Sequence, residues 1–556
     1  MLRPLPLLTV LVLAGPVALG LAGTVLPALG WLPAAGLTGW SLAPLRAVAD
    51  WPGLPAAAGV SLSSGLLSTA GALLVATLLL AGWHGTPVAR ALERLLSPLL
   101  AVPHAAAALG LAFLIAPSGW IVRVAAGPLG LDRPPDALVV QDPWGLALTA
   151  GLIAKEVPFL LLMMLAALPQ ADPARRLRVA RSLGQGRVAA WLKAVFPTVY
   201  AQVRLPVLVV LVYGMTNVDV AAILGPSTPP TLSVQVTRWM VDPDLAMRAV
   251  GAAGAVVQLA LVAGALAAWR IGERGVARAA LAWTVRARGL PEAAARGTGA
   301  ALGLVSALGV LGGLAALALW SVAARWRFPD AWPEGLTART WMRHGPEMLE
   351  VAGATLGLAL AATAASLLLV VGCLEAEHRH RLGPSRALWL LYLPLLVPQI
   401  AFLPGLALLP LWLGASAGWG AVTAVHVVFV LPYVFLSLSG PWRAWDDRTA
   451  RVAAGLGRGP DAVLWRLRLP MLLAPVLTAV AVGMAVSVGQ YLPTLLIGGG
   501  RTATLTTEAV ALAAGGDRRA IGAWGIGQAG AAFAPFALAL LVPALAWRNR
   551  RGMGRG

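Results

Sequence analysis

The chain has 556 residues and a formal net charge of +19; 59% of its residues are hydrophobic, only 12% are charged, and its mean hydropathy is +0.79. A soluble protein of this size could not cover so much apolar surface, so the composition excludes a soluble globular class and indicates a polytopic membrane protein. No basic segment forms a domain of its own, which argues against nucleic-acid binding.

Apolar runs long enough to cross a bilayer recur along the whole chain. The hydrocarbon core requires about 20 apolar residues per helix, and the runs fall into two sets of six. They lie near 5–27, 63–83, 96–117, 145–167, 205–225 and 247–269, and then near 297–322, 350–373, 387–411, 418–440, 471–493 and 522–546. The predicted fold class is therefore all-α, with about 12 transmembrane helices.

The basic residues indicate which side of the membrane each connecting segment occupies. If the N-terminus is inside and the spans alternate, most Lys and Arg residues fall in inner segments, especially 168–204, 270–297 and 441–470. This asymmetry follows the positive-inside rule and predicts that both termini lie in the cytoplasm.

One basic segment occurs twice. Residues 178–203 align with residues 451–476 without a gap at an offset of 273, and ten of the 26 positions are identical, including Gly184 with Gly457 and Pro197 with Pro470. We call the surrounding inner segments the first glycine loop (168–204) and the second glycine loop (441–470). Each lies between the fourth and fifth spans of its set.

The similarity continues beyond these loops. At the same offset Asn217 falls on Gln490, and upstream VPHAAAALGLAFL (102–114) matches VPQIAFLPGLALL (397–409) at an offset of 295. Because each set starts inside and has six spans, the two are parallel repeats. We expect a first six-span domain at 1–270, a cytoplasmic linker at 271–296 and a second six-span domain at 297–556.

Each glycine loop has the local pattern of two short helices separated by a turn. Asp172 and Pro173 are suited to the N-cap and the first position of a helix over 173–183. Glycines can supply the positive φ of the turn that follows. The turn glycines are Gly184 and Gly186 in the first loop and Gly457 and Gly459 in the second, where Asp446 and Asp447 precede the helix. Such a rigid cytoplasmic knob suits insertion into a groove of a partner.

The glycine loops resemble the coupling loop of ABC-importer permeases, whose pattern is Glu-Ala-Ala, three residues, Gly, nine residues, then Ile-x-Leu-Pro. The first loop matches it with Arg178-Val179-Ala180, Gly184 and Ala194-Val195-Phe196-Pro197. The second loop matches it with Arg451-Val452-Ala453, Gly457 and Leu467-Arg468-Leu469-Pro470. Arg replaces the initial Glu in both loops, so a contact that requires this Glu is not carried over.

The wider layout resembles fused permeases of iron(III), thiamine and polyamine or sulfate importers, and 103–120 and 155–170 look closest to a thiamine-type subgroup. The resemblance implies the type I ABC importer permease fold, the bacterial inner membrane, a periplasmic solute-binding protein and a separate ATPase subunit in two copies. The sequence has no G-x-x-x-x-G-K-[ST] phosphate loop, so ATP hydrolysis is expected from that partner. We predict no enzyme activity, cofactor or metal site.

Polar residues within the predicted spans are candidates for a translocation path. Ionisable groups there are costly unless they are paired or face a cavity, and interhelical hydrogen bonding or packing is the alternative role for each. The candidates are Lys155, Glu156, Asn217, Asp219 and Gln490. His426 is expected to be a hydrogen-bonded core histidine.

Two other function classes are the alternatives to a permease. A twelve-span secondary transporter would need a coupling-ion site of paired carboxylates, and a membrane-embedded enzyme would need clustered acids or histidines at one face. The spans offer only Glu156 and Asp219 for the former, and Asp446-Asp447 is the one candidate pair for the latter. For the small-molecule substrate, thiamine or a related small cation is the first expectation, with iron(III), polyamine and oxyanion cargoes as alternatives.

Overall fold

The computed structural model describes residues 3–285, 289–380, 390–412, 414 and 417–546. The regular secondary structure of this part of the chain is helical, with no β-strand beyond two isolated bridges. Ten helices are long and apolar enough to span a membrane, and two bent helix pairs raise the number to as many as 12. The all-α, two-times-six prediction is confirmed.

The first repeat contains α1 to α13. The elements are α1 (Leu5–Ala28), η1 (Pro33–Ala35), α2 (Ala43–Ala49), α3 (Leu54–Trp83), α4 (Pro87–Leu96), η2 (Ser97–Ala101), α5 (His104–Ile115), α6 (Trp120–Leu129), α7 (Leu146–Ala171), α8 (Pro173–Ser182), α9 (Arg187–Ala190), η3 (Trp191–Val195), α10 (Phe196–Thr216), α11 (Asp219–Leu224), α12 (Leu232–Met240) and α13 (Met247–Val285).

The second repeat contains α14 to α25. The elements are α14 (Glu292–Val322), α15 (Arg339–His380), α16 (Leu393–Leu396), α17 (Gln399–Trp412), α18 (Trp419–Arg443), α19 (Asp447–Gly455), α20 (Pro460–Val463), η5 (Leu464–Arg468), α21 (Leu469–Met471), α22 (Leu473–Val488), α23 (Leu492–Gly498), α24 (Leu505–Leu512) and α25 (Arg518–Ala546). The expected linker 271–296 is helical over 271–285, as the end of α13, and over 292–296, as the start of α14.

The first span of each repeat packs against the other repeat. Helix α1 contacts α17, and α14 contacts α5 and α3. Glycines allow both approaches: a Cβ added to Gly405 would lie 2.6 Å from the carbonyl carbon of Gly23, and one added to Gly110 would lie 2.6 Å from that of Gly313. Because Gly110 and Gly405 are equivalent in the repeat, the two halves interlock through the same close backbone contact.

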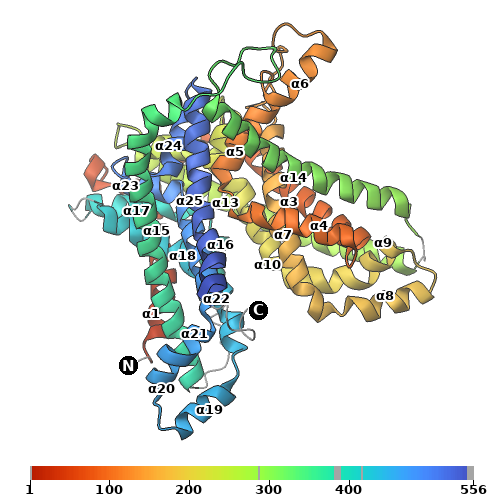
Figure 1. Cartoon of the computed structure of the whole chain (residues 1–556). Coiled ribbons are helices and arrows are strands. Elements are labelled where there is room, and N and C mark those ends of the chain that lie inside the picture. The colour runs from red at the N-terminus through yellow and green to blue at the C-terminus, as the bar shows by residue number, and fades with distance from the viewer. Residues whose placement is uncertain (1–2, 286–288, 381–389, 413, 415–416, 547–556) are drawn as a thin grey trace.

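A second pair of equivalent contacts relates the halves. The backbone N–H of Leu232 donates to Ser61 Oγ at 3.1 Å, and that of Leu505 donates to Thr355 Oγ1 at 2.9 Å. In both repeats a hydroxyl from the second span therefore satisfies the first turn of the short helix that precedes the sixth span. Helices α8 and α9 form one protruding end of the body, and α19 and α20 form another (Figure 1).

Candidate functional site

Both glycine loops contain the same helix-ending turn. In the first, the N–H groups of Gln185 and Gly184 donate to the carbonyls of Ala180 and Arg181 at 3.2 and 3.0 Å. In the second, the N–H groups of Arg458 and Gly457 donate to those of Ala453 and Ala454, both at 3.0 Å. This is the Schellman pattern, which requires a left-handed residue; the φ angles of the two turn glycines are +76° and +74°.

Aspartates cap the first helix of each loop. Asp172 accepts the N–H of Arg175 at 3.4 Å, and Asp446 accepts the N–H of Arg448 at 2.9 Å. The predicted second short helix of the first loop is not a separate element: α9 continues through the wide turn η3 into α10. The first knob is therefore a short helix and a glycine turn leading directly into the fifth span, whereas the second is followed by a 76° bend between Pro460–Met471 and Leu473–Val488.

Each knob exposes the same pair of apolar side chains. Val179 and Leu183 in the first loop are 58% and 74% exposed, and Val452 and Leu456 in the second are 66% and 76% exposed. Residues four apart lie on one helix face, so each knob presents a small apolar surface. The other predicted loop residues at the exposed surface are Arg178, Gly184, Pro197, Arg451, Gly457, Gly459 and Pro470. Of the remaining ones, Ala180 and Gly186 are half-buried and Ala453 is buried. Exposed apolar side chains on a capped, rigid knob are suited to a protein partner.

The first knob is held from behind by the other repeat. The Glu292 carboxylate, at the start of α14, accepts the N–H of Val188 at 2.9 and 3.1 Å and that of Ala189 at 3.3 Å. Arg187 also donates to the carbonyl of His84. Burial, together with the nearby Arg187 cation, lowers the pKa of the His84 imidazole, which favours a neutral ring at pH 7.

The second knob is held by a buried ion pair. Arg468, which is 2% exposed, donates to Glu375 Oε2 at 2.6 Å. Its guanidinium also lies 4.1 Å from the Trp445 ring centroid and 2.7 Å from the ring nitrogen of His378. The position equivalent to Arg468 in the first loop is Val195. The two knobs thus share a turn but are anchored by different chemistry.

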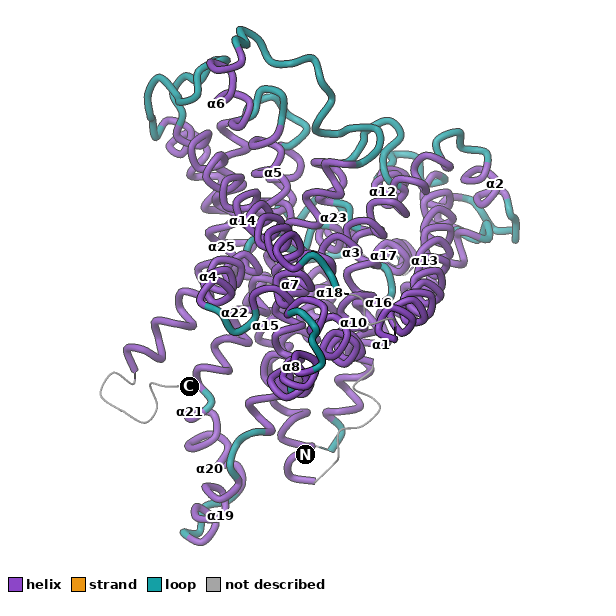
Figure 2. Tube along the Cα trace, turned by 90° about the vertical axis from the view of Figure 1, so that its right-hand side faces the viewer, coloured by secondary structure: helices purple, strands orange, loops and turns teal. Residues whose placement is uncertain are grey.

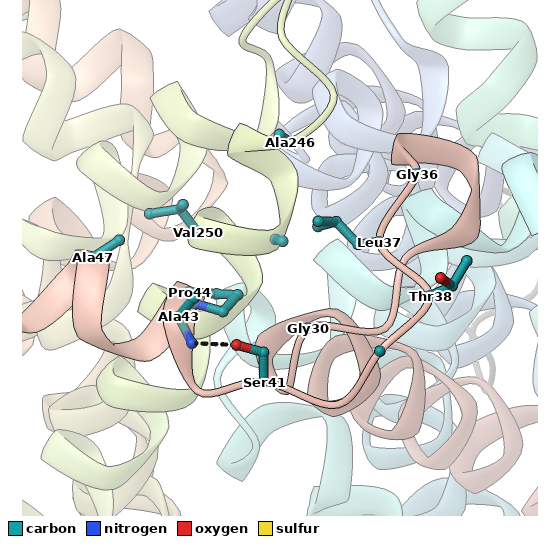
Figure 3. A pocket seen from close by; sticks show the side chains of 12 residues that line it. Gly30, Gly36, Leu37, Thr38, Ser41, Ala43, Pro44, Ala47, Ala246 and Val250 are labelled. Carbon is teal, nitrogen blue, oxygen red and sulfur yellow. Dashed lines mark hydrogen bonds between the residues drawn. The ribbon is translucent and has the colours of Figure 1, made fainter.

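Two pockets flank the described helices. One, of about 660 Å³, lies beside the first knob and is lined in part by Arg175, Arg176 and Lys193. The other, of about 470 Å³, lies between residues 30–47 and the start of α13. Figure 3 shows that most of its lining residues are small and apolar, and that the Ser41 hydroxyl beside them accepts the N–H of Ala43. No ionisable side chain lines this second pocket.

Lys155 and Glu156 are both buried in α7 and point to different partners. Lys155 Nζ donates to the carbonyls of Leu99 and Leu100 at 2.7 and 3.3 Å, at the end of η2. Glu156 Oε1 lies 3.5 Å from His104 Nε2. Neighbours on a helix diverge by about 100°, which agrees with the expectation that the two do not simply neutralise each other.

Asn217 and Gln490 lie at breaks in the fifth spans rather than within continuous helices. Asn217 separates α10 from α11; its amide donates to the Gly214 carbonyl at 3.1 Å and accepts the N–H of Ala221 at 3.0 Å. This side chain satisfies backbone groups that the break leaves open. Gln490 occupies the equivalent break before α23 and is half-buried.

His426 is a core histidine in the described structure, as expected. It is 1% exposed, and its two ring nitrogens lie 2.8 Å from Ser487 Oγ and 2.9 Å from Thr494 Oγ1. Sequence reasoning did not find Glu292, which it placed within the linker, nor the Arg468–Glu375 pair. The difference between Val195 and Arg468 in otherwise aligned loops was the available signal for that pair.

Two interlocked six-span repeats with matched knobs define the class: a fused, two-repeat membrane permease. No protein-family model matches the chain. It is 31% identical over 526 residues to the inner membrane ABC transporter permease protein YnjC of Escherichia coli, a match that covers 94% of this chain and 93% of that protein. The chain therefore belongs to the ABC transporter permease family, which confirms the predicted family.

Shorter stretches are similar to permeases of two other transport systems. The spermidine/putrescine transport system permease protein PotC of Haemophilus influenzae is 27% identical over 139 residues, 24% of this chain and 54% of that protein. The molybdenum transport system permease protein ModB of Mycobacterium tuberculosis is 37% identical over 91 residues, 16% of this chain and 34% of that protein. These relatives and the apolar helices identify a multi-pass inner-membrane transport protein.

Proposed function

We propose that the chain is the permease subunit of an importer in which a separate ATPase, present in two copies, drives passage of a small solute delivered by a periplasmic binding protein. The observation that supports this most is the pair of knobs with one backbone geometry and one exposed apolar pair each. Two equivalent surfaces suit two copies of one partner.

In this proposal the domains are 1–270 and 297–556, joined at 271–296, and both termini lie in the cytoplasm. Closure of the ATPase dimer would displace both knobs; the first leads without a break into the fifth span through η3, and the second reaches α22 through η5, α21 and a 76° bend. The ATPase-contacting residues are Arg178, Val179, Ala180, Gly184, Gly186 and Pro197, and Arg451, Val452, Ala453, Gly457, Gly459 and Pro470.

The substrate within this function is a small solute, with thiamine as one candidate. The named relatives include polyamine and molybdenum permeases, so polyamine and oxyanion cargoes are the alternatives, together with iron(III).

The test is recovery of the ATPase with variants of the turn glycines. No atom lies within 4 Å of a Cβ added at Gly184 or Gly457, so valine acts there through backbone strain, about 1–2 kcal/mol per left-handed residue. The expected result is loss of the ATPase in a gentle-detergent pull-down, or uptake uncoupled from ATP hydrolysis. Gly130→Val is the matched control because Gly130 has a φ of +64°, the same turn and the same open surroundings.

Full uptake and normal ATPase recovery by the Gly184→Val/Gly457→Val double variant would refute the coupling role. Transport by the chain alone in liposomes without an ATPase would favour the secondary transporter instead. Recovery of one soluble periplasmic protein with the ATPase would support the importer direction.

A further inference from the structure

Six polar and aromatic side chains from both repeats lie within direct contact or electrostatic range of one another. We call them the interface cluster: His104, Glu156, Tyr213, Asp219, Tyr433 and Tyr491. They come from α5, α7, α10, α11, α18 and the residue preceding α23, and α7, α10 and α18 occupy the middle of the helical body (Figures 1 and 2).

The direct contacts within the cluster lie in the first repeat, and the second repeat approaches them electrostatically. The His104 and Tyr213 rings are 4.7 Å apart, and Glu156 lies 3.5 Å from His104. The Glu156 carboxylate is also within electrostatic range of Tyr433, and that of Asp219 is within range of Tyr491. The first repeat therefore supplies the acids, and the second supplies two tyrosines within electrostatic range of them.

The Asp219 carboxylate has no side-chain partner within the described part of the chain. It is 8% exposed, and the backbone groups of Asp219 and Val220 are the nearby polar groups that favour its charged form. No cation of the described residues lies within salt-bridge distance of it, and His104 is only within electrostatic range. A buried carboxylate without a counter-ion is costly inside a membrane protein.

The three tyrosine rings are half-buried although they lie between the two halves of the protein. The hydroxyls of Tyr213, Tyr433 and Tyr491 form no hydrogen bond with another residue of the described part of the chain. Aromatic faces attract cations within about 6 Å. Partly accessible aromatic rings near a carboxylate that has no counter-ion form a surface suited to binding a cation.

The charged side chains around the cluster determine whether a cationic or an anionic ligand is favoured there. Two carboxylates, Glu156 and Asp219, stand against one ammonium, that of Lys155, and this ammonium is already bound to two backbone carbonyls. A dianion would be repelled here. Among the described residues no group of three or more His, Cys, Asp and Glu side chains could hold a metal ion, so a bare metal is also disfavoured.

Resting on the proposed transport function, we infer that the interface cluster is a transit site for a small organic cation, with Asp219 and Glu156 as counter-ions and the tyrosine rings as its walls. This commits the permease to cationic cargo and against oxyanions. It also gives the predicted path residues Glu156 and Asp219 a specific role, while Lys155 and Asn217 position backbone.

The test uses the full-length chain in lipid nanodiscs, titrated with thiamine, spermidine and molybdate, with the unfolding midpoint and intrinsic fluorescence as readouts. At least one of the two organic cations is expected to bind and raise the midpoint, and molybdate is not. Asp219→Asn and Glu156→Gln should each weaken cation binding at least tenfold, and Tyr433→Leu about threefold. Asp132→Asn, at an exposed position, is the control and should bind as the unmodified chain does.

Binding of molybdate in preference to both cations, absence of cation binding, or cation binding that Asp219→Asn leaves within twofold would each overturn the inference. Failure of the cation-site inference can be distinguished from failure of the proposed function. The Asp219→Asn variant should still bring down the ATPase, whatever its effect on cation binding. Loss of the ATPase with the Gly184 and Gly457 variants alone tests the coupling, whatever the cargo.

Discussion

Replacing Gly186 with alanine tests how the first knob is anchored. The φ of Gly186 is −62°, which alanine adopts without strain. A Cβ there would, however, lie 2.7 Å from Cδ and 2.9 Å from Cγ of Glu292. Because these atoms belong to a flexible side chain, Glu292 would move away, and the cost is that of the hydrogen bonds it loses.

The expected loss of local stability follows from the hydrogen bonds that Glu292 would lose. Glu292 accepts the N–H groups of Val188 and Ala189, the first turn of α9. Loss of a side-chain N-cap costs about 0.5–2 kcal/mol, and a bond to a charged acceptor about 1.5–3 kcal/mol. Since Glu292 is half-buried, we expect about 1–2 kcal/mol of local stability to be lost, a factor of about 5–30 in the opening equilibrium.

Hydrogen exchange measured by mass spectrometry on the protein in nanodiscs is the assay. Gly186→Ala and Glu292→Ala should speed exchange of the amides at 188 and 189 by that factor, and the double variant should add little, since both remove one contact. The matched control is Gly459→Ala, where φ is −72° and nothing lies within 4 Å of the added Cβ. Unchanged exchange in Gly186→Ala, or an equal effect of Gly459→Ala, would refute the reasoning.

Three further substitutions have defined outcomes in thermal unfolding. Arg468→Ala should cost about 3–5 kcal/mol because it leaves Glu375 buried without its partner, and an unchanged midpoint would contradict the ion pair. Lys155→Met should cost about 1–3 kcal/mol by leaving two backbone carbonyls at η2 unsatisfied; a gain in stability would contradict this. Gly405→Ala should cost about 3 kcal/mol or more by forcing α1 from α17, whereas Gly353→Ala, in open surroundings within α15, should be neutral or stabilising.

The features that sequence predicted are those set by local chemistry and repetition. A left-handed turn position strongly favours glycine, so Gly184 and Gly457 were recognisable from spacing alone. The twelve spans follow from apolar length. The breaks in the fifth spans were not predicted: Asn217 reads as a polar residue within an apolar run, and only the structure shows that its amide satisfies the backbone there.

Contacts between segments far apart in the chain could not be predicted from the sequence. Glu292 lies 104 residues from the amide of Val188 that it accepts, and nothing in its surroundings, an Ala-rich basic stretch, indicates that contact. The tyrosines of the interface cluster are equally ordinary in sequence, since aromatic residues are common in membrane helices. Their role depends on how the halves pack, since Tyr433 and Tyr491 come within electrostatic range of the acids of the other repeat.

The two repeats have kept the surface that a partner would contact and diverged in what supports it. Both knobs retain the Schellman turn and the exposed apolar pair, yet the first is tied to α14 by Glu292 and the second to α15 by the Arg468–Glu375 pair. A force applied equally to both knobs would therefore reach the helices through a capped turn on one side and a buried ion pair on the other. The acids of the interface cluster likewise belong to one repeat alone, so the structure combines a symmetric docking surface with an asymmetric interior.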